Sequence, residues 1–138
     1  MIRVVIDTNV VVSATLVRHG YPAAILDLVV SGAIAPYVSI PILAEYREVL
    51  ARPRIMKSAA GAREIVAAIK AGGLVVEPFE KLTVCADPDD DIFVECAVQS
   101  GADFLITGNV RDFPSSYGHT RIVTPREFVE LWREMVKA

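Results

Sequence analysis

Short apolar runs recur along the chain, and a segment with helical spacing follows most of them. The runs are rich in valine, isoleucine and leucine, which suits strands buried on both faces of a parallel sheet. We predict strands at residues 3–6, 34–38, 74–77, 104–107 and 121–123. Pro36 weakens the second strand, because proline cannot donate a hydrogen bond to a neighbouring strand.

Capping signals mark the helical segments as clearly as their apolar stripes do. Ser39 suits an N-cap, and Asp87 followed by Pro88 suits another. Thr124 begins a capping box that Glu127 completes. The helices are predicted at residues 23–30, 40–50, 59–71, 88–100 and 125–135, with a short apolar stretch and a loop at 10–20. Strands that alternate with helices predict one domain, residues 1–138, built as a three-layer α/β/α sandwich with a mostly parallel central sheet.

Small polar residues follow the two most apolar predicted strands. Open α/β sheets bind ligands outside the carboxyl ends of their strands. We therefore expect a site at this edge, lined by Asp7, Thr8 and Asn9 after the first strand and by Thr107 and Asn109 at the end of the fourth, with Asp112 close by. In the alternative reading, Asp7 caps a turn, Asn109 is an ordinary turn residue and Asp112 is exposed.

Two helices contribute acids to the same edge. The helix at 88–100 is apolar around most of its circumference, except for a ridge formed by Asp91, Glu95 and Gln99 at i, i+4 and i+8. Asp91 begins that ridge on the side where parallel strands end. Capping alone could explain an acid there, yet four acids at 87–91 exceed what a cap needs. Glu45 lies beside the apolar stripe of its helix, where it faces either a cleft or solvent.

A cluster of acids needs protons or a cation. Unpaired carboxylates about 4 Å apart repel by about 4 kcal/mol at an effective dielectric constant of about 20. Because no cysteine or histidine falls in the cluster, the ligands are oxygen atoms, which favour Mg²⁺ or Mn²⁺. Such ions usually serve phosphate chemistry, in which they polarise the phosphoryl oxygen and activate water.

Composition narrows the class of protein. Hydrophobic residues make up 53% of the chain, which indicates burial against a second copy or a partner, through the wide apolar faces of the helices at 22–30 and 40–50. No apolar run approaches the roughly 20 residues that span a bilayer, and no signal-peptide pattern precedes Asp7. Cys85 and Cys96 imply no disulfide framework, so the cytoplasm is the expected compartment.

Several motifs together resemble the PIN-domain family. They are Asp7-Thr8-Asn9, the segment from Ser39 to Glu45, the acid-rich stretch 87–91, and Leu105-Ile106-Thr107-Gly108-Asn109. The closing segment 122–128 also resembles a subgroup regarded as toxins of toxin–antitoxin systems, akin to the VapC type. The resemblance spans the whole chain, and the order and spacing of the motifs make it fairly specific.

The resemblance implies a metal-dependent ribonuclease, usually dimeric, that a small antitoxin protein inhibits. It assigns the first three acids to Asp7, Glu45 and Asp91. Many relatives have aspartate where this chain has Asn109, and Asp112 follows three residues later. The fourth acid is therefore open between these two positions, and so is the choice between one metal ion and two.

The formal net charge of −3 argues mildly against a nucleic-acid binder, but it becomes +1 without the acids Asp7, Glu45, Asp91 and Asp112. Basic residues gather near the end of the Glu45 helix, where they either follow an RNA backbone or form a solvated helix end: Arg47, Arg52, Arg54, Lys57 and Arg63.

Two classes of protein are alternatives to the ribonuclease. A phosphoaspartate protein fits poorly, because Asn9 stands where such phosphatases have a second aspartate and no lysine follows Thr107. The alternative from another class is a non-catalytic, dimeric RNA- or partner-binding module with a degraded metal site. Asn109 favours that alternative, and the retention of Asp7, Glu45 and Asp91 speaks against it.

Overall fold

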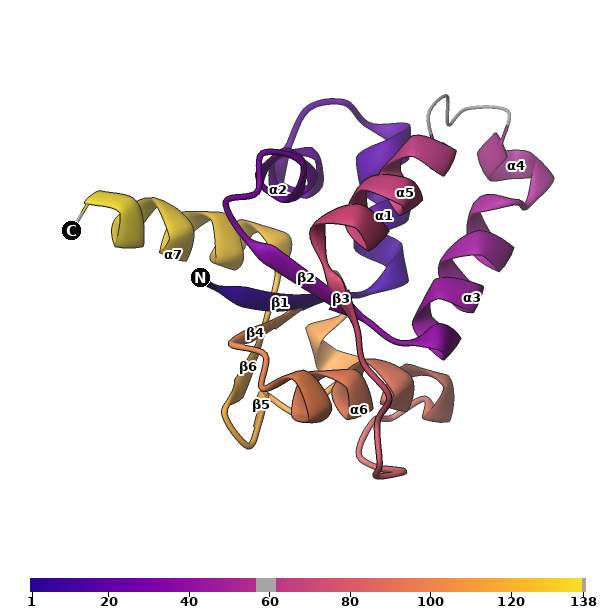
Figure 1. Ribbon diagram of the computed structural model, residues 1–138, viewed down its shortest axis with the longest axis vertical. Helices are drawn as coiled ribbons and strands as arrows, with labels where there is room; N and C mark the ends of the chain where they lie inside the picture. The colour runs from indigo at the N-terminus through magenta and orange to yellow at the C-terminus, as the bar shows by residue number, and fades with distance from the viewer. Residues whose placement is uncertain (57–61, 138) are drawn as a thin grey trace.

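The computed structural model describes residues 1–56 and 62–137, in which a six-stranded sheet lies between two layers of helices (Figure 1). The strands run in the order β3-β2-β1-β4-β6-β5, and all neighbours are parallel except β5 and β6. Their bounds are β1 Arg3–Ile6, β2 Ala35–Val38, β3 Leu74–Val75, β4 Phe104–Ile106, β5 Ser116–Tyr117 and β6 Thr120–Val123. The predicted α/β sandwich with a mostly parallel sheet is confirmed.

Helix α6 covers one face of the sheet, and α1, α2 and α5 lie over the other (Figure 1). Helix α7 packs against α2 and β4. The bounds are α1 Thr8–Leu16, α2 Tyr21–Val30, α3 Ile40–Leu50, α4 Pro53–Met56, α5 Ala62–Gly72, α6 Asp91–Ser100 and α7 Pro125–Lys137, with 3₁₀ turns η1 Pro88–Asp90 and η2 Val110–Asp112. Within the described ranges, no helix has the length and apolar character needed to cross a membrane.

The predicted caps are all present. The Ser39 hydroxyl accepts the N–H of Ile42 at 3.3 Å, and the Asp87 carboxylate accepts the N–H of Asp89 at 2.9 Å. Thr124 and Glu127 exchange their two hydrogen bonds at 3.0 and 3.1 Å. Three helical elements thus begin where their sequences place them, and two of them, α3 and η1, carry candidate site residues.

Pro36 is tolerated in β2 although this strand lies inside the sheet. The N–H of Ala35 donates to Ile2 on the β1 side, so the nitrogen of Pro36 faces β3. The β2–β3 ladder begins only at Tyr37 and Leu74, so no hydrogen bond is lost at Pro36. A Cβ on Gly73 would lie 1.9 Å from the Pro36 carbonyl oxygen, so only glycine lets the chain enter β3 here.

Some expectations differ from the structure. Residues 8–16 form helix α1 instead of an irregular stretch, because Val10 and Val11 become fully buried and this burial overrides the low helix propensity of valine. Strand β5 was not predicted from the sequence. Residues 59–61 of the predicted third helix lie outside the described residues.

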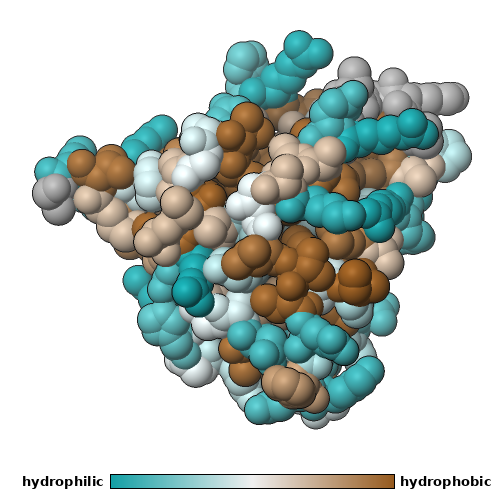
Figure 2. All heavy atoms as spheres, in the orientation of Figure 1, coloured by the Kyte–Doolittle hydropathy of each residue, from teal (hydrophilic) through white to brown (hydrophobic). Residues whose placement is uncertain are grey.

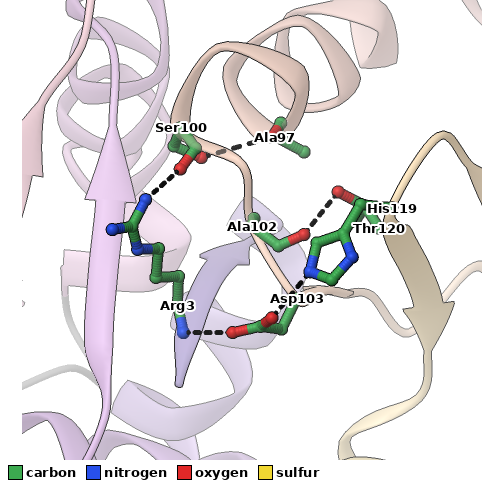
Figure 3. Close-up of polar contacts among 7 residues, drawn as sticks. All are labelled: Arg3, Ala97, Ser100, Ala102, Asp103, His119 and Thr120. Atoms are coloured by element: carbon green, nitrogen blue, oxygen red, sulfur yellow. Dashed lines mark hydrogen bonds and ion pairs between the residues drawn. The ribbon is translucent and has the colours of Figure 1, made fainter. Parts of the chain in front are cut away.

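Polar contacts at the amino edge of the sheet hold the starts of β1, β4 and β6 together (Figure 3). Asp103 accepts the N–H of Arg3 at 2.9 Å and contacts the His119 ring at 2.8 Å, while the Arg3 guanidinium donates to the Ser100 carbonyl oxygen. Partial burial opposes the charge of Asp103, but these hydrogen bonds outweigh it and lower its pKa. The polar groups of this edge are therefore used in holding the strands.

Candidate active site

Asp7 and Thr107 meet at the carboxyl edge because β1 and β4 are neighbours in register. Ile6 pairs with Ile106, and the N–H of Asp7 donates to the Ile106 carbonyl oxygen at 2.9 Å. The Thr107 hydroxyl donates to Asp7 Oδ2 at 2.7 Å and accepts the N–H of Asn109 at 3.0 Å. Burial raises the pKa of Asp7, opposed by the Thr107 hydrogen bond, and the nearby charge of Glu45 raises it further.

Helix α3 brings Glu45 to the same place. The Thr8 hydroxyl, directly after Asp7, donates to Glu45 Oε2. The neighbouring Tyr46 is fully buried, and its hydroxyl donates to the carbonyl oxygen of Ile6. Glu45, predicted to lie beside the apolar stripe of its helix, therefore faces the residues around Asp7.

The loop after β4 completes this edge. Asn9 Oδ1 accepts the N–H of Gly108 at 3.2 Å, and the N–H of Asp112 donates to the Asn109 carbonyl oxygen at 3.0 Å. The Asp112 carbonyl oxygen accepts the N–H of Ala86, which ties η2 to the segment that leads into α6. Thr8 thus contacts Glu45, Thr107 contacts Asp7 and Asn109, and Asn9 contacts Gly108, while their role in lining a site stays a prediction.

Asp90 is the acid of the 87–91 stretch whose pKa the neighbouring acids raise. Burial, together with the charges of Asp7, Asp87, Asp112 and Glu45, raises its pKa from the usual 3.8 to about 7. Asp90 is spaced at i, i+4 and i+7 with Val94 and Ala97, which are buried against the sheet. That spacing is the sequence signal that Asp90 faces the sheet. The polar ridge beginning at Asp91 is the more conspicuous pattern in the same segment.

The Asp91 carboxylate contacts backbone N–H groups, and its assignment as a metal ligand stays a prediction. Its Oδ1 accepts the N–H groups of Val84 and Cys85 at 3.0 and 2.9 Å. The other two ridge residues behave alike: Glu95 accepts the N–H of Leu82 at 2.8 Å, and Gln99 accepts that of Phe79 at 3.3 Å. The ridge holds residues 79–85 along α6, and we call this segment the strap.

The donors at the carboxyl edge fit a hard divalent cation. Asp7, Glu45, Asp90 and Asp112 supply carboxylate oxygens only, and their mutual repulsion is the condition that a cation relieves. Among the described residues, no three Asp, Glu, His or Cys side chains are already drawn together around one point. The fit therefore rests on the chemistry of the donors and on the raised pKa values of Asp7 and Asp90.

Within the described ranges, the predicted basic residues form no hydrogen bond or ion pair with these four acids. Arg47 is exposed, and Arg52 pairs with Glu48 at 3.2 Å along the surface of α3. Arg54 and Arg63 are exposed on α4 and α5, and Lys57 lies outside the described residues. No contact in the described ranges joins Arg47 to Glu45, so its role as a lining residue stays a prediction.

Comparisons with known proteins agree with this geometry. A model of the PIN domain matches residues 3–111. The chain is 32% identical over 147 residues to the uncharacterized protein MJ1680 of Methanocaldococcus jannaschii, an alignment that covers 98% of this chain and 94% of that protein. A chain of VapBC2 from Rickettsia felis, solved bound to a DNA fragment from the promoter, superposes with a TM-score of 0.59 at 13% identity, over 89% of this chain and 98% of that one. The chain therefore belongs to the PIN domain family, whose members are generally nucleases.

Proposed function

We propose that this protein is an endoribonuclease that hydrolyses single-stranded or loop RNA with the help of Mg²⁺ or Mn²⁺. The observation that carries the proposal is that four carboxylates from separate segments lie near one edge of the sheet, where the charges of Asp7, Glu45 and Asp112 act on Asp90. Asp7 follows β1, Glu45 lies on α3, Asp90 ends η1 and Asp112 ends η2. Nothing but a proton or a cation neutralises such a group, and a nuclease family supplies the reaction.

In this proposal Asp7 and Asp90 hold the cation, and Glu45 and Asp112 ligate it directly or through water. Asp90 takes the role of metal ligand that the sequence predicts for Asp91, because Asp91 already accepts two backbone N–H groups. When bound, the cation would polarise the phosphoryl oxygen and lower the pKa of water. Asn109 has no carboxylate, so Asp112 serves as the fourth acid. One strongly held ion, with a second added with the RNA, fits this donor set.

Other side chains of the site orient the acids, and the acids orient the attacking water. Thr107 fixes one oxygen of Asp7, and Thr8 fixes one oxygen of Glu45, so each acid keeps its other oxygen available. Glu45 or Asp112 orients the attacking water and accepts its proton. Burial raises the pKa of the Cys85 and Cys96 thiols to about 12, which removes both as nucleophiles at neutral pH. Direct attack by water, with no covalent enzyme intermediate, is therefore the expected route.

The test is cleavage of labelled single-stranded RNA, with single-stranded DNA alongside, in Mg²⁺, Mn²⁺ or EDTA. Asp7→Asn and Asp90→Asn should each lower the rate at least 100-fold, and EDTA should abolish cleavage. Asp89→Asn is the matched control, because Asp89 is an exposed neighbour in the same acidic stretch. Cleavage that persists in EDTA rules out the mechanism. A protein whose melting temperature ignores Mn²⁺ and that cleaves nothing would be the non-catalytic binding module.

The proposed partners are a second copy and a small antitoxin protein. The VapBC2 chain that shares this fold comes from a complex of two components, as its name indicates. An arginine on an antitoxin segment could pair with Asp7 or Asp90 in place of the cation, since guanidinium and carboxylate groups form paired hydrogen bonds. Co-purification of a small neighbouring gene product that suppresses cleavage tests this partner.

The second copy has a candidate surface beside the acids. A groove of about 530 Å³ runs between the start of α3, β3 and α6, and its apolar lining includes Ile40, Pro41, Val75 and Phe79. Figure 2 shows apolar surface gathered in front of β3, with hydrophilic side chains around it. Glu77, Glu80 and Lys81 also line the groove, so two copies can pair groups of opposite sign across a two-fold axis.

A further inference from the structure

Tyr46 occupies a position at which three elements of the site converge. It is fully buried on α3, next to Glu45 in the chain, and its hydroxyl donates to the carbonyl oxygen of Ile6 in β1. Ile6 is the residue before Asp7. Burial raises the pKa of this hydroxyl well above its usual value, and Cys96 on α6, Asp7 and Glu45 add to the effect.

The carbonyl oxygen of Ile6 is available to Tyr46 because the pairing of β1 with β2 ends before this residue. The N–H of Asp7 donates toward β4, so the carbonyl oxygen of Ile6 points to the opposite side, toward β2. The pairs between β1 and β2 end at Val4 and Pro36, and β2 gives way to the Ser39 cap of α3. The β1–β2 pairs thus end before Ile6, and the Tyr46 hydroxyl donates a hydrogen bond to this oxygen.

Two bonds from adjacent α3 residues therefore enclose Asp7. Tyr46 binds the residue before it, and Glu45 accepts the hydroxyl of Thr8, the residue after it. Adjacent side chains on a helix point about 100° apart, so the two contacts together fix both the depth of α3 and its rotation about its own axis. The consequence is a set distance between the carboxylates of Glu45 and Asp7.

We propose that Tyr46 is a positioning residue, whose hydroxyl fixes α3 against β1 and so keeps the Glu45 carboxylate beside Asp7. This inference rests on the proposed cation-dependent function of the four acids. Tyr46 touches neither RNA nor cation in this role, and it acts through Glu45. A phenylalanine at this position would fill the same volume and leave α3 free to shift or rotate over the end of β1.

The test uses Tyr46→Phe, with Phe128→Leu as the control for lost stability. Phe128 is equally buried but packs edge-on against Phe104, with ring centroids 5.4 Å apart, and neither ring takes part in the contacts of the acids. Mn²⁺ affinity is measured by calorimetry and unfolding by urea. Tyr46→Phe should weaken Mn²⁺ binding about 10-fold or more, the range seen when groups that orient metal ligands are removed. Phe128→Leu should stay near the wild-type affinity despite a comparable loss of stability.

A double-mutant cycle with Glu45→Gln separates positioning from a general structural effect. If Tyr46 acts through Glu45, Tyr46→Phe should change Mn²⁺ affinity little once Glu45→Gln is present. An undiminished effect in that background, or a Tyr46→Phe protein that matches the Phe128→Leu control, overturns the inference and leaves the proposed function intact. Failure of the wild-type protein to bind Mn²⁺ or Mg²⁺ instead removes the proposed function, and the inference with it.

Discussion

Asp90 is a carboxylate that the fold holds where its charge is disfavoured. Its burial and the charges of Asp7, Asp112 and Glu45 raise its pKa to about 7, from a usual value of 3.8. A raised pKa means that the folded state prefers the protonated form. The contribution of Asp90 to the free energy of unfolding should therefore be largest below about pH 4 and should be lost as the pH rises through about 7.

Asp90→Asn should remove this contribution in the metal-free protein. We expect urea midpoints of the wild type to decrease between pH 4 and about 7 and those of Asp90→Asn to change less, with the variant more stable at pH 7.5. Asp89→Asn should follow the wild-type curve. Saturating Mn²⁺ should abolish this decrease in the wild type but should have little effect on the curve of Asp90→Asn. Parallel curves for the wild type and Asp90→Asn would contradict the assignment of Asp90 to the acid cluster.

Thr107 links the two halves of the site through one hydroxyl. It donates to Asp7 and accepts from Asn109, and the residue is fully buried. Thr107→Val keeps the shape but leaves the N–H of Asn109 and an oxygen of Asp7 without this partner, which should cost about 1–3 kcal/mol in urea unfolding. Thr107→Ser keeps the hydroxyl and should lose much less. Equal losses for both variants would mean that the methyl group, and not the hydroxyl, stabilises the site.

At the scale of elements, α6 begins next to the proposed acid cluster and organises a loop along one of its sides. Successive turns present Asp91, Glu95 and Gln99, and each accepts backbone N–H groups of the strap. Backbone groups in an irregular segment need partners, and this ridge provides them without a strand. The strap in turn carries the chain from β3 to the acids.

Asp91→Ala should therefore release the strap and leave the acids in place. The N–H groups of Val84 and Cys85 lose their acceptor, so their hydrogen exchange should become at least 10-fold faster. Stability should fall by about 1–3 kcal/mol, the cost of leaving a partly buried donor unpaired. The increase in melting temperature caused by Mn²⁺ should persist. Loss of that increase with unchanged exchange would return Asp91 to the role of a metal ligand.

The sequence predicted most elements because their signals are local. The caps at Ser39, Asp87 and Thr124 and the apolar strands follow from short patterns, and so do Asp7 and Thr107 at the ends of two strands. Helix α1 was missed because three consecutive valines favour a strand, and the burial that overrides this preference comes from distant helices. The spacing of Asp90 with Val94 and Ala97 is a local signal, whereas the contacts of Asp91 depend on the strap, whose path no local pattern reveals.

At the scale of the whole molecule, the apolar surplus of the chain is only partly absorbed by the core. Large apolar side chains remain exposed in two areas. Ile40, Val75 and Phe79 border the groove between α3, β3 and α6, while Leu16, Val17 and Val30 lie at the ends of α1 and α2. The sequence placed both α2 and α3 at a dimer interface, and the groove favours the α3 side because its exposed residues share one concave surface.

Ile40 and Val30 provide a matched pair for testing this choice. Ile40 is 68% exposed at the groove, and Val30 is 70% exposed at the end of α2. Both substitutions with glutamate should leave the monomer folded, since neither side chain belongs to the core. If the groove forms the dimer interface, Ile40→Glu should give a monomer by light scattering at micromolar concentration, because two buried carboxylates would face each other across the axis. Val30→Glu should remain a dimer. The reverse result would move the interface to α2, and a monomeric wild-type protein would remove the second copy from the proposed partners.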